Sequence, residues 1–457
     1  MTQSMSTELR NEATPRWKGH AVLILCFVAI VFDGYDLVVY GSTVPTILKF
    51  QEWGVTPGQA GLIGSLALVG MLVGTLSVGI LTDKLGRRRI MLACIAWFST
   101  CMLLTAFAPS AEVFGFLRFL TGLGLGGIVP TCIALTVEYA RKERRQIANA
   151  VMFSGYSVGG VGASLLAINL LQHIDFRWMY AIGALPLITL LPIAWKLLPE
   201  SVAYLARKQR IEEARATADR YGLVYSDIVT AEDVKTGAEA PKSAMKTLFT
   251  RKWIRSTVLF ALANFCGLLL VYGLNTWLPQ IMRQAGFQLG DALTFLLVLN
   301  AGAIVGSISA SVLADKIGIR KVVTASFLLA FVAILMLSLQ LPLAMLLVIV
   351  AFAGLGSVGT QILVGGYCAT HYPQSLSATA LSWSLGIGRI GAICGPLIGG
   401  LIAGMAFGWQ LNFYMFAAFA VVGAIVVFSV PKLTEAAPEL APAEESRSST
   451  QSGAQPG

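Results

Sequence analysis

An all-α integral membrane protein, with twelve transmembrane helices in two six-helix bundles, is the fold class that this sequence predicts. The first observation is composition: the 457 residues are 56% hydrophobic and 12% charged, whereas soluble domains carry about 25% charged residues. The second is a series of twelve apolar runs of about 20 residues, the length at which a helix crosses a bilayer. The third is an internal repeat, in which Tyr272-Gly273 matches Tyr40-Gly41 at an offset of 232 positions.

The apolar runs define the predicted spans in chain order. The first run resembles a signal-peptide core at its start, but it continues to about Ser42 without a small-residue cleavage site, so we expect a retained helix. The spans of the first half lie near residues 21–42, 58–82, 90–108, 112–137, 147–171 and 178–197. The spans of the second half lie near residues 253–276, 292–314, 322–340, 342–367, 377–404 and 410–430.

Composition divides the chain further. Two bundles, 21–199 and 253–430, are separated by a charged linker, 200–252, and flanked by an N-terminal tail, 1–20, and a disordered tail, 431–457. Within the linker, Ser201 to Tyr221 has helical composition and ends before Gly222, which predicts a helix with a glycine C-cap.

The distribution of positive charge predicts the topology. If the N-terminus is cytoplasmic, only Lys49, Arg177 and Arg283 of the 33 Lys and Arg residues fall outside. Two more lie within spans, and the remaining 28 face the cytoplasm, as the positive-inside rule requires. We therefore expect both termini in the cytoplasm. The net charge of +9 is explained by topology and indicates no nucleic-acid partner, and the seven scattered cysteines suit small buried hydrophobes.

The repeat extends to glycines and loop charges but excludes four buried charges. The offset of 232 pairs Gly122 with Gly354 and Arg88 with Arg320, which predicts a parallel repeat of six spans. Four charged residues inside the spans have no charged counterpart at this offset: Asp33, Asp36, Arg118 and Arg389. A charge at mid-bilayer costs roughly 2.5–3.5 kcal/mol, so such residues mark ion or substrate pathways.

Asp33 and Asp36 are the candidate proton site. Their i,i+3 spacing places both carboxylates on one helix face, with Tyr40 one turn further on. Two carboxylates in low dielectric cannot both ionise easily, so one is expected to hold a proton near neutral pH. The alternative is that one aspartate is a structural partner and only the other titrates.

Depth along the helices suggests partners for these acids. At 1.5 Å per residue, Asp33 and Arg389 each lie roughly 18 Å from the cytoplasmic helix ends, and Asp36 and Arg118 each lie roughly 9 Å from the outer ends. We expect Arg118 to couple to the aspartates, and Arg389 to offer its planar fork to a substrate carboxylate. For both arginines the alternative is a structural role.

Several motifs resemble those of the major facilitator superfamily. GILTDKLGRRR (Gly79 to Arg89) resembles its signature loop, with a degenerate second copy at Ser311 to Lys321. RFLTGLGLGG (Arg118 to Gly127) resembles its fourth-helix motif, and LPES (Leu198 to Ser201) is also similar. In the first span, FDGYDLVVYG (Phe32 to Gly41) resembles the aromatic acid:proton symporter family.

This resemblance implies a function. A member of that family would import an aromatic carboxylate of the benzoate or hydroxybenzoate type with protons, by alternating access, across the bacterial cytoplasmic membrane. It would be no enzyme, would need no cofactor or metal, and would work as a monomer in the lipid bilayer. The aromatic ring would need a stacking surface, for which Tyr40 and Trp383 are candidates. The alternatives are a symporter of another organic acid or a sugar, and a proton-coupled exporter of drugs or metabolites.

The resemblance also implies a gate on the cytoplasmic side. Asp83 would cap or bridge it, together with Gly86, whereas Arg87 and Arg88 suit topology determinants equally well. Glu138 lies where the fourth span meets a basic loop, which favours a solvated salt bridge, although its position also resembles a charged site of the symporter family.

Overall fold

The computed structural model describes residues 17–141, 144–229, 242–405 and 407–431, and within these ranges every regular element is helical. Twelve helical segments are long and apolar enough to cross a membrane. Each lies on one of the predicted apolar runs. The predicted class, an all-α membrane protein of twelve spans, is therefore confirmed.

The first half contains six spans. The first five are single helices: α2 (Trp17–Ile47), α3 (Pro57–Leu85), α4 (Arg87–Ala106), α5 (Ala111–Tyr139) and α6 (Arg145–Leu170). The sixth is broken into α7 (Arg177–Gly183), η2 (Leu185–Leu187) and α8 (Leu190–Leu197). Pro186 lies at the break, and a proline removes one backbone donor and disfavours a continuous helix.

The second half repeats this plan. Its spans are α14 (Ile254–Gln284), α15 (Leu289–Ile317), α16 (Ile319–Met336), α17 to α18, α19 (Gln374–Ala403) and α20 (Gln410–Phe428). The fourth of these joins α17 (Leu343–Gly354) to α18 (Thr360–His371) through η3 (Leu355–Gly359), which is a π-helical turn.

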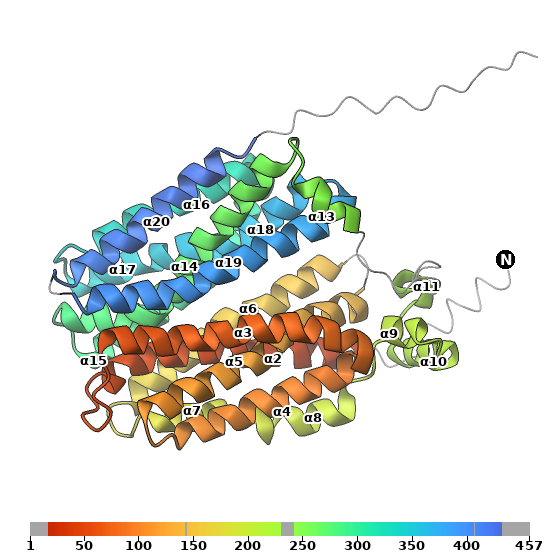
Figure 1. The fold of residues 1–457 in the computed structure, drawn as a ribbon, viewed down its shortest axis with the longest axis horizontal. Coiled ribbons are helices and arrows are strands. Elements are labelled where there is room, and N and C mark those ends of the chain that lie inside the picture. Colours follow the sequence, from red (N-terminus) through yellow and green to blue (C-terminus); the bar gives the residue numbers. More distant parts are fainter. Residues whose placement is uncertain (1–16, 142–143, 230–241, 406, 432–457) are drawn as a thin grey trace, which may run out of the picture.

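The two halves form two bundles, and the start of α2 and the end of α20 lie on the same side of the molecule (Figure 1). We call the side that carries Trp17 and Pro431 the terminal face, and the opposite side the distal face. Four short helices between the bundles lie at the terminal face: α9 (Val202–Arg207), α10 (Ile211–Tyr221), α11 (Tyr225–Ile228) and α13 (Lys242–Leu248).

The linker helix predicted over Ser201 to Tyr221 is interrupted. Gln209 adopts a left-handed φ of 62° between α9 and α10, so the chain turns there. The sequence carries no glycine or proline at that point to signal the turn. The end of α10 is as predicted, because Gly222 is its C-cap with φ 67°.

The internal repeat is visible in the helix crossings. A Cβ added to Gly122 would lie 1.9 Å from the Ala67 carbonyl oxygen, and one added to Gly354 would lie 2.0 Å from that of Leu299. These four residues keep the offset of 232. The close crossing of α3 and α5 is therefore reproduced by α15 and α17, and in both places only glycine lets the backbones approach so closely.

The bundles contact each other in their distal halves. In α3, the Ser65 hydroxyl donates a 2.7 Å hydrogen bond to the Ile393 carbonyl of α19. In α2, Gly41 lies against the Asn275 carbonyl of α14, where an added Cβ would be 1.9 Å from the oxygen. These contacts close the molecule on its distal side.

Candidate functional site

The first buried charge pair joins α2 to α5. Asp36 and Arg118 form an ion pair whose side chains are almost completely buried. The Arg118 guanidinium also lies over two aromatic rings, 5.4 Å from the centroid of Tyr40 and 5.9 Å from that of Tyr180. The charge is thus balanced by a carboxylate and held between two tyrosines.

Both tyrosines are fixed by their hydroxyl groups. The Tyr40 hydroxyl donates to the Ala60 carbonyl at the start of α3. The Tyr180 hydroxyl is 2.8 Å from the Thr43 hydroxyl. Because each ring is anchored at its far end, the guanidinium between them has little freedom to move.

Asp33 lies one helical turn from Asp36 but has different surroundings. Its side chain is buried, and its Oδ2 has no hydrogen-bond partner among the described residues. Arg389 of α19 is close enough to interact with it electrostatically. A buried carboxylate oxygen without a donor is costly, so this atom is the exceptional feature of the site.

A pair of tyrosines connects the bundles beside Asp33. The Tyr156 hydroxyl of α6 donates a 2.9 Å hydrogen bond to the Tyr272 hydroxyl of α14. The Arg389 Nη1 donates to the same Tyr272 oxygen over 3.5 Å, at the limit of a hydrogen bond. Tyr272 is the repeat counterpart of Tyr40, so corresponding residues of the two halves contact the two buried arginines.

Gly34 explains why α6 comes so close to the acids. An added Cβ at this position would lie 2.0 Å from the Tyr156 carbonyl oxygen. The glycine between Asp33 and Asp36 therefore brings the Tyr156 segment of α6 against α2.

The site encloses a small cavity. Its volume is about 20 Å³, enough for roughly one water molecule. It is lined by Asp33, Asp36, Leu37, Tyr40, Gly64, Ala67, Leu68, Met71, Arg118, Tyr156, Tyr272 and Thr276. Both acids thus share one space, closed on one side by apolar residues of α3.

Of the three predicted substrate-binding residues, Tyr40 lines this cavity. Neither Arg389 nor Trp383 is among the residues that line this cavity. Trp383 instead stacks edge-on against Phe249, which follows α13, with ring centroids 5.2 Å apart. Trp383 thus contacts the end of the linker in this conformation.

At the terminal face, Glu138 forms the predicted salt bridge but in a buried setting. Its carboxylate lies 2.5 Å from Arg87 Nη1, and its side chain is 3% exposed. It also accepts hydrogen bonds from the Ser201 hydroxyl, at 2.7 Å, and from the Val202 backbone N–H. The expectation of a solvated pair is wrong, because the start of α9 covers the acid.

The loop between α3 and α4 fits against the end of the sixth span. Gly86 has φ 92°, and an added Cβ there would lie 2.5 Å from a Glu200 carboxylate oxygen. The same carboxylate accepts from the Arg88 backbone N–H at 3.0 Å. The Arg88 side chain donates to the carbonyls of Leu198 and Trp195, at 2.7 and 2.6 Å. Asp83 is mostly exposed and lies 3.3 Å from Arg207 of α9.

Glu200 is the residue that sequence reasoning missed. It belongs to the LPES segment, whose resemblance to the superfamily was the available signal. Charge patterning alone places it in a solvated linker. Among the described residues, no group of three or more His, Cys, Asp or Glu side chains is placed to hold a metal ion.

Comparison with known proteins identifies the family. The family model described as Major Facilitator Superfamily matches residues 26–384 and 298–454. A benzoate transport protein of Acinetobacter baylyi is 37% identical over 431 residues, covering 92% of this chain and 91% of the relative. A gentisate transporter of Corynebacterium glutamicum is 36% identical over 412 residues, covering 89% and 86%.

Solved structures agree on the fold. The xylose transporter XylE of E. coli, in a partially occluded inward-open conformation, has a TM-score of 0.73 at 14% identity and covers 92% of this chain and 99% of its own. The chain therefore belongs to the Major Facilitator Superfamily and to the aromatic acid transporters within it. It is a membrane transporter and not an enzyme.

Proposed function

We propose that this protein is a proton-coupled symporter that imports an aromatic carboxylate of the benzoate or hydroxybenzoate type by alternating access. The observation that carries the proposal is the buried Asp33 carboxylate, whose Oδ2 lacks a partner within the described residues, beside a second acid that is already paired. The relatives named as benzoate and gentisate transporters support the substrate class.

Asp33 carries the proton in this proposal. Asp36 is neutralised by Arg118, so it has no need of a proton to remain buried. Asp33, whose Oδ2 has no partner in the described part of the chain, lines a cavity large enough for about one water. A proton on that oxygen removes the cost of an unpaired buried charge. This assignment divides the two acids between a structural and a transporting role.

Arg389 holds the substrate carboxylate. Among the described residues, the one hydrogen bond of its side chain is the long contact to Tyr272. A guanidinium has five donors in a planar fork that matches a carboxylate, so most of its capacity is available. The substrate ring then lies against Tyr40, Leu68 and Met71, which line the adjacent cavity. Trp383 joins this surface only if α19 moves relative to α13.

The terminal face is cytoplasmic in this scheme. It carries the basic clusters 84–89 and 141–145, as the positive-inside rule requires for a bacterial inner-membrane protein. The distal contacts between the bundles then close the periplasmic side, so the conformation faces inward. Residues 21–199 and 253–430 move as two bodies of one monomer, joined by the linker 200–252. The contacts of Asp83, Gly86, Arg87, Arg88 and Glu138 form the gating cluster that couples that linker to the first bundle.

Uptake into proteoliposomes tests the function. The purified chain is reconstituted and offered radiolabelled benzoate, 4-hydroxybenzoate, an aliphatic carboxylate and a sugar, under an imposed gradient with the outside acidic. We expect accumulation of the aromatic acids that collapses with a protonophore. A membrane potential, negative inside, supplies about 2.3 kcal/mol per 100 mV for each net positive charge. Stimulation by the potential would show that more than one proton accompanies each anion. Efflux driven by the same gradient, or equal uptake of the sugar, would refute symport of aromatic acids.

A further inference from the structure

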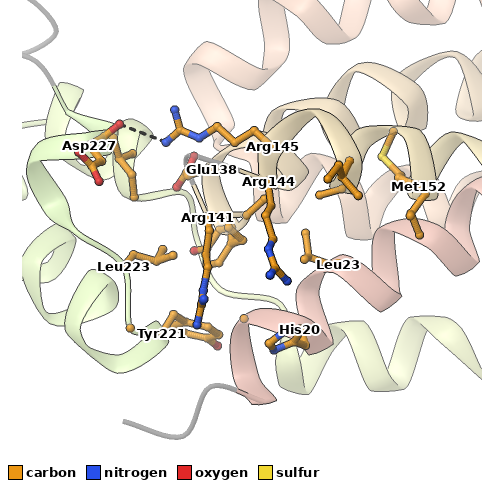
Figure 2. A pocket seen from close by; sticks show the side chains of 18 of the residues that line it. His20, Leu23, Glu138, Arg141, Arg144, Arg145, Met152, Tyr221, Leu223 and Asp227 are labelled. Carbon is orange, nitrogen blue, oxygen red and sulfur yellow. Dashed lines mark hydrogen bonds between the residues drawn. The ribbon is translucent and has the colours of Figure 1, made fainter. Parts of the chain in front are cut away.

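A second cavity, far larger than the first, opens at the terminal face (Figure 2). Its volume is about 830 Å³. It lies where the ends of α2 and α5 and the start of α6 meet the segment from Tyr221 to Ile228. The proposed transport of substrate does not use this cavity, because its lining residues come entirely from the first bundle and the linker segment.

One part of the cavity is cationic. Arg141, Arg144 and Arg145 line it, and Figure 2 shows the first two extending toward the space between Tyr221 and His20. Arg145 donates to the Asp227 carbonyl at 3.2 Å, while its buried Nε has no hydrogen-bond partner within the described ranges. Among the described residues, neither Arg141 nor Arg144 forms an ion pair. This concentration of donors fits an anion.

The start of α6 adds to this positive potential. Arg144 is the N-cap of the helix, and its side chain makes no capping hydrogen bond. The first backbone N–H groups of a helix lack internal acceptors, and the helix dipole is positive there. The anion therefore meets backbone donors as well as guanidinium groups.

The remaining wall is apolar and belongs to membrane-spanning helices. Leu23, Ile24 and Phe27 of α2 line it together with Ile147 and Val151 of α6. Ile24, Ile147 and Val151 are 60%, 63% and 55% exposed. Exposed aliphatic side chains within transmembrane spans are suited to contact with hydrocarbon.

We propose that this cavity binds an anionic phospholipid of the adjacent leaflet. The headgroup phosphate lies among Arg141, Arg144 and the start of α6, and one acyl chain follows the exposed residues of α2 and α6 into the membrane. Basic pockets between transmembrane helices on the cytoplasmic side are known to favour anionic headgroups. A soluble phosphate satisfies the arginines but leaves the apolar wall uncovered.

Two acids, Glu138 and Asp227, also line the cavity. Glu138 does not oppose this ligand, because its carboxylate is engaged by Arg87 and Ser201. Tyr221 and Leu223 line the opposite wall, so a bound lipid would contact the linker segment and the first bundle together. The lipid would thus hold the linker against the bundle.

Native mass spectrometry of the full chain, released from detergent micelles that contain phosphatidylglycerol or phosphatidylcholine, tests this without any transport assay. We expect wild-type protein to retain phosphatidylglycerol in preference to phosphatidylcholine. The double variant R141Q/R144Q should lose affinity for phosphatidylglycerol about thirtyfold, because each basic residue near the membrane surface contributes about one factor of five to six. The control K316Q/K321Q removes the same charge from exposed residues at the turn between α15 and α16 in the second bundle, and should retain the lipid.

The possible outcomes separate the sources of the anion. Equal retention of phosphatidylglycerol by wild type and R141Q/R144Q would overturn the proposal, as would equal loss in the control. Displacement of the lipid by millimolar glycerol phosphate would assign the site to a soluble anion instead. Because Arg141 and Arg144 are exposed, the variant should fold. The variant I147S/V151S, which retains all three arginines, should also bind phosphatidylglycerol more weakly; unchanged binding would exclude the acyl-chain part of the proposal.

Discussion

Arg118 is paired with Asp36, and this pair is sealed from solvent between α2 and α5. Asp33 lies on the same helix face, and no described residue donates to its Oδ2. The two acids therefore differ in chemistry, and we expect them to differ in function as well.

Replacement of Asp33 should uncouple transport from protons. D33N keeps the volume of the side chain but cannot carry a proton on a carboxylate. We expect proteoliposomes with D33N to lose accumulation driven by a pH gradient while retaining exchange of labelled for unlabelled benzoate. Both activities are measured in the same vesicles. Accumulation by D33N equal to that of wild type would exclude Asp33 as the proton carrier.

Replacement of Asp36 should act on stability. D36N leaves the Arg118 charge buried and uncompensated, which typically costs about 3–5 kcal/mol. We expect a large fall in the midpoint of thermal unfolding in detergent, and the double variant D36N/R118Q should recover part of that loss. If D36N unfolds at the wild-type temperature, the pair contributes nothing to the stability of the fold. The assignment of a structural role to Asp36 and a transporting role to Asp33 would then be refuted.

Replacement of Arg389 should weaken substrate binding. Hydrogen bonds to a charged group are worth about 1.5–3 kcal/mol, so R389Q should raise the dissociation constant for benzoate about 10–100-fold. Equilibrium binding by scintillation proximity measures this change. The exposed Arg255 on the terminal side of the same bundle supplies the control R255Q, which should bind as wild type does. Unchanged affinity in R389Q would remove Arg389 from the substrate site.

The close contact at Gly34 makes a sharp steric prediction. In G34A the new methyl group would lie 2.0 Å from the Tyr156 carbonyl oxygen, so α2 and α6 must separate. Overpacking of this kind costs about 1–3 kcal/mol, and benzoate uptake should fall severely. The matched control is G162A on α6, where an added Cβ meets no atom of the described residues within 4 Å. That variant should be active and stable, since alanine favours a helix by about 0.5–1 kcal/mol.

Alanine substitution of two equivalent loop glycines distinguishes the effect of backbone strain from the effect of a steric clash. Gly86 and Gly318 have nearly the same φ, 92° and 94°, and occupy equivalent positions of the repeat. An added Cβ at Gly86 meets the Glu200 carboxylate, whereas one at Gly318 has no neighbour within 4 Å in the described part of the chain. We expect G86A to reduce uptake and thermal stability more than G318A. Similar losses in both variants would assign the effect to strain alone.

Much of the fold was readable from the sequence because bilayer thickness restricts the choices. Run length places each span, and the rise per residue places Asp36 and Arg118 at a common depth, where they do meet. Depth does not report rotation about the helix axis. For that reason the sequence could not show that Arg118 pairs with Asp36 alone, or that Trp383 contacts Phe249.

Local departures from regular helix could not be predicted from the sequence. Gln209 takes a left-handed conformation although no glycine signals it. Before that turn, the start of α9 covers Glu138. The burial of Glu138 therefore depends on a tertiary contact between the linker and α5. The π-helical turn at Leu355–Gly359 likewise has no signature in the apolar pattern.

The small size of the cavity beside Asp33 has a kinetic consequence. A space of about 20 Å³ cannot hold a benzene ring, so the walls of this cavity must part before an aromatic ring can occupy it. Every binding event must wait for the walls to part. The observed association rate should therefore level off as ligand concentration rises, at a ceiling set by how often the protein opens and independent of diffusion.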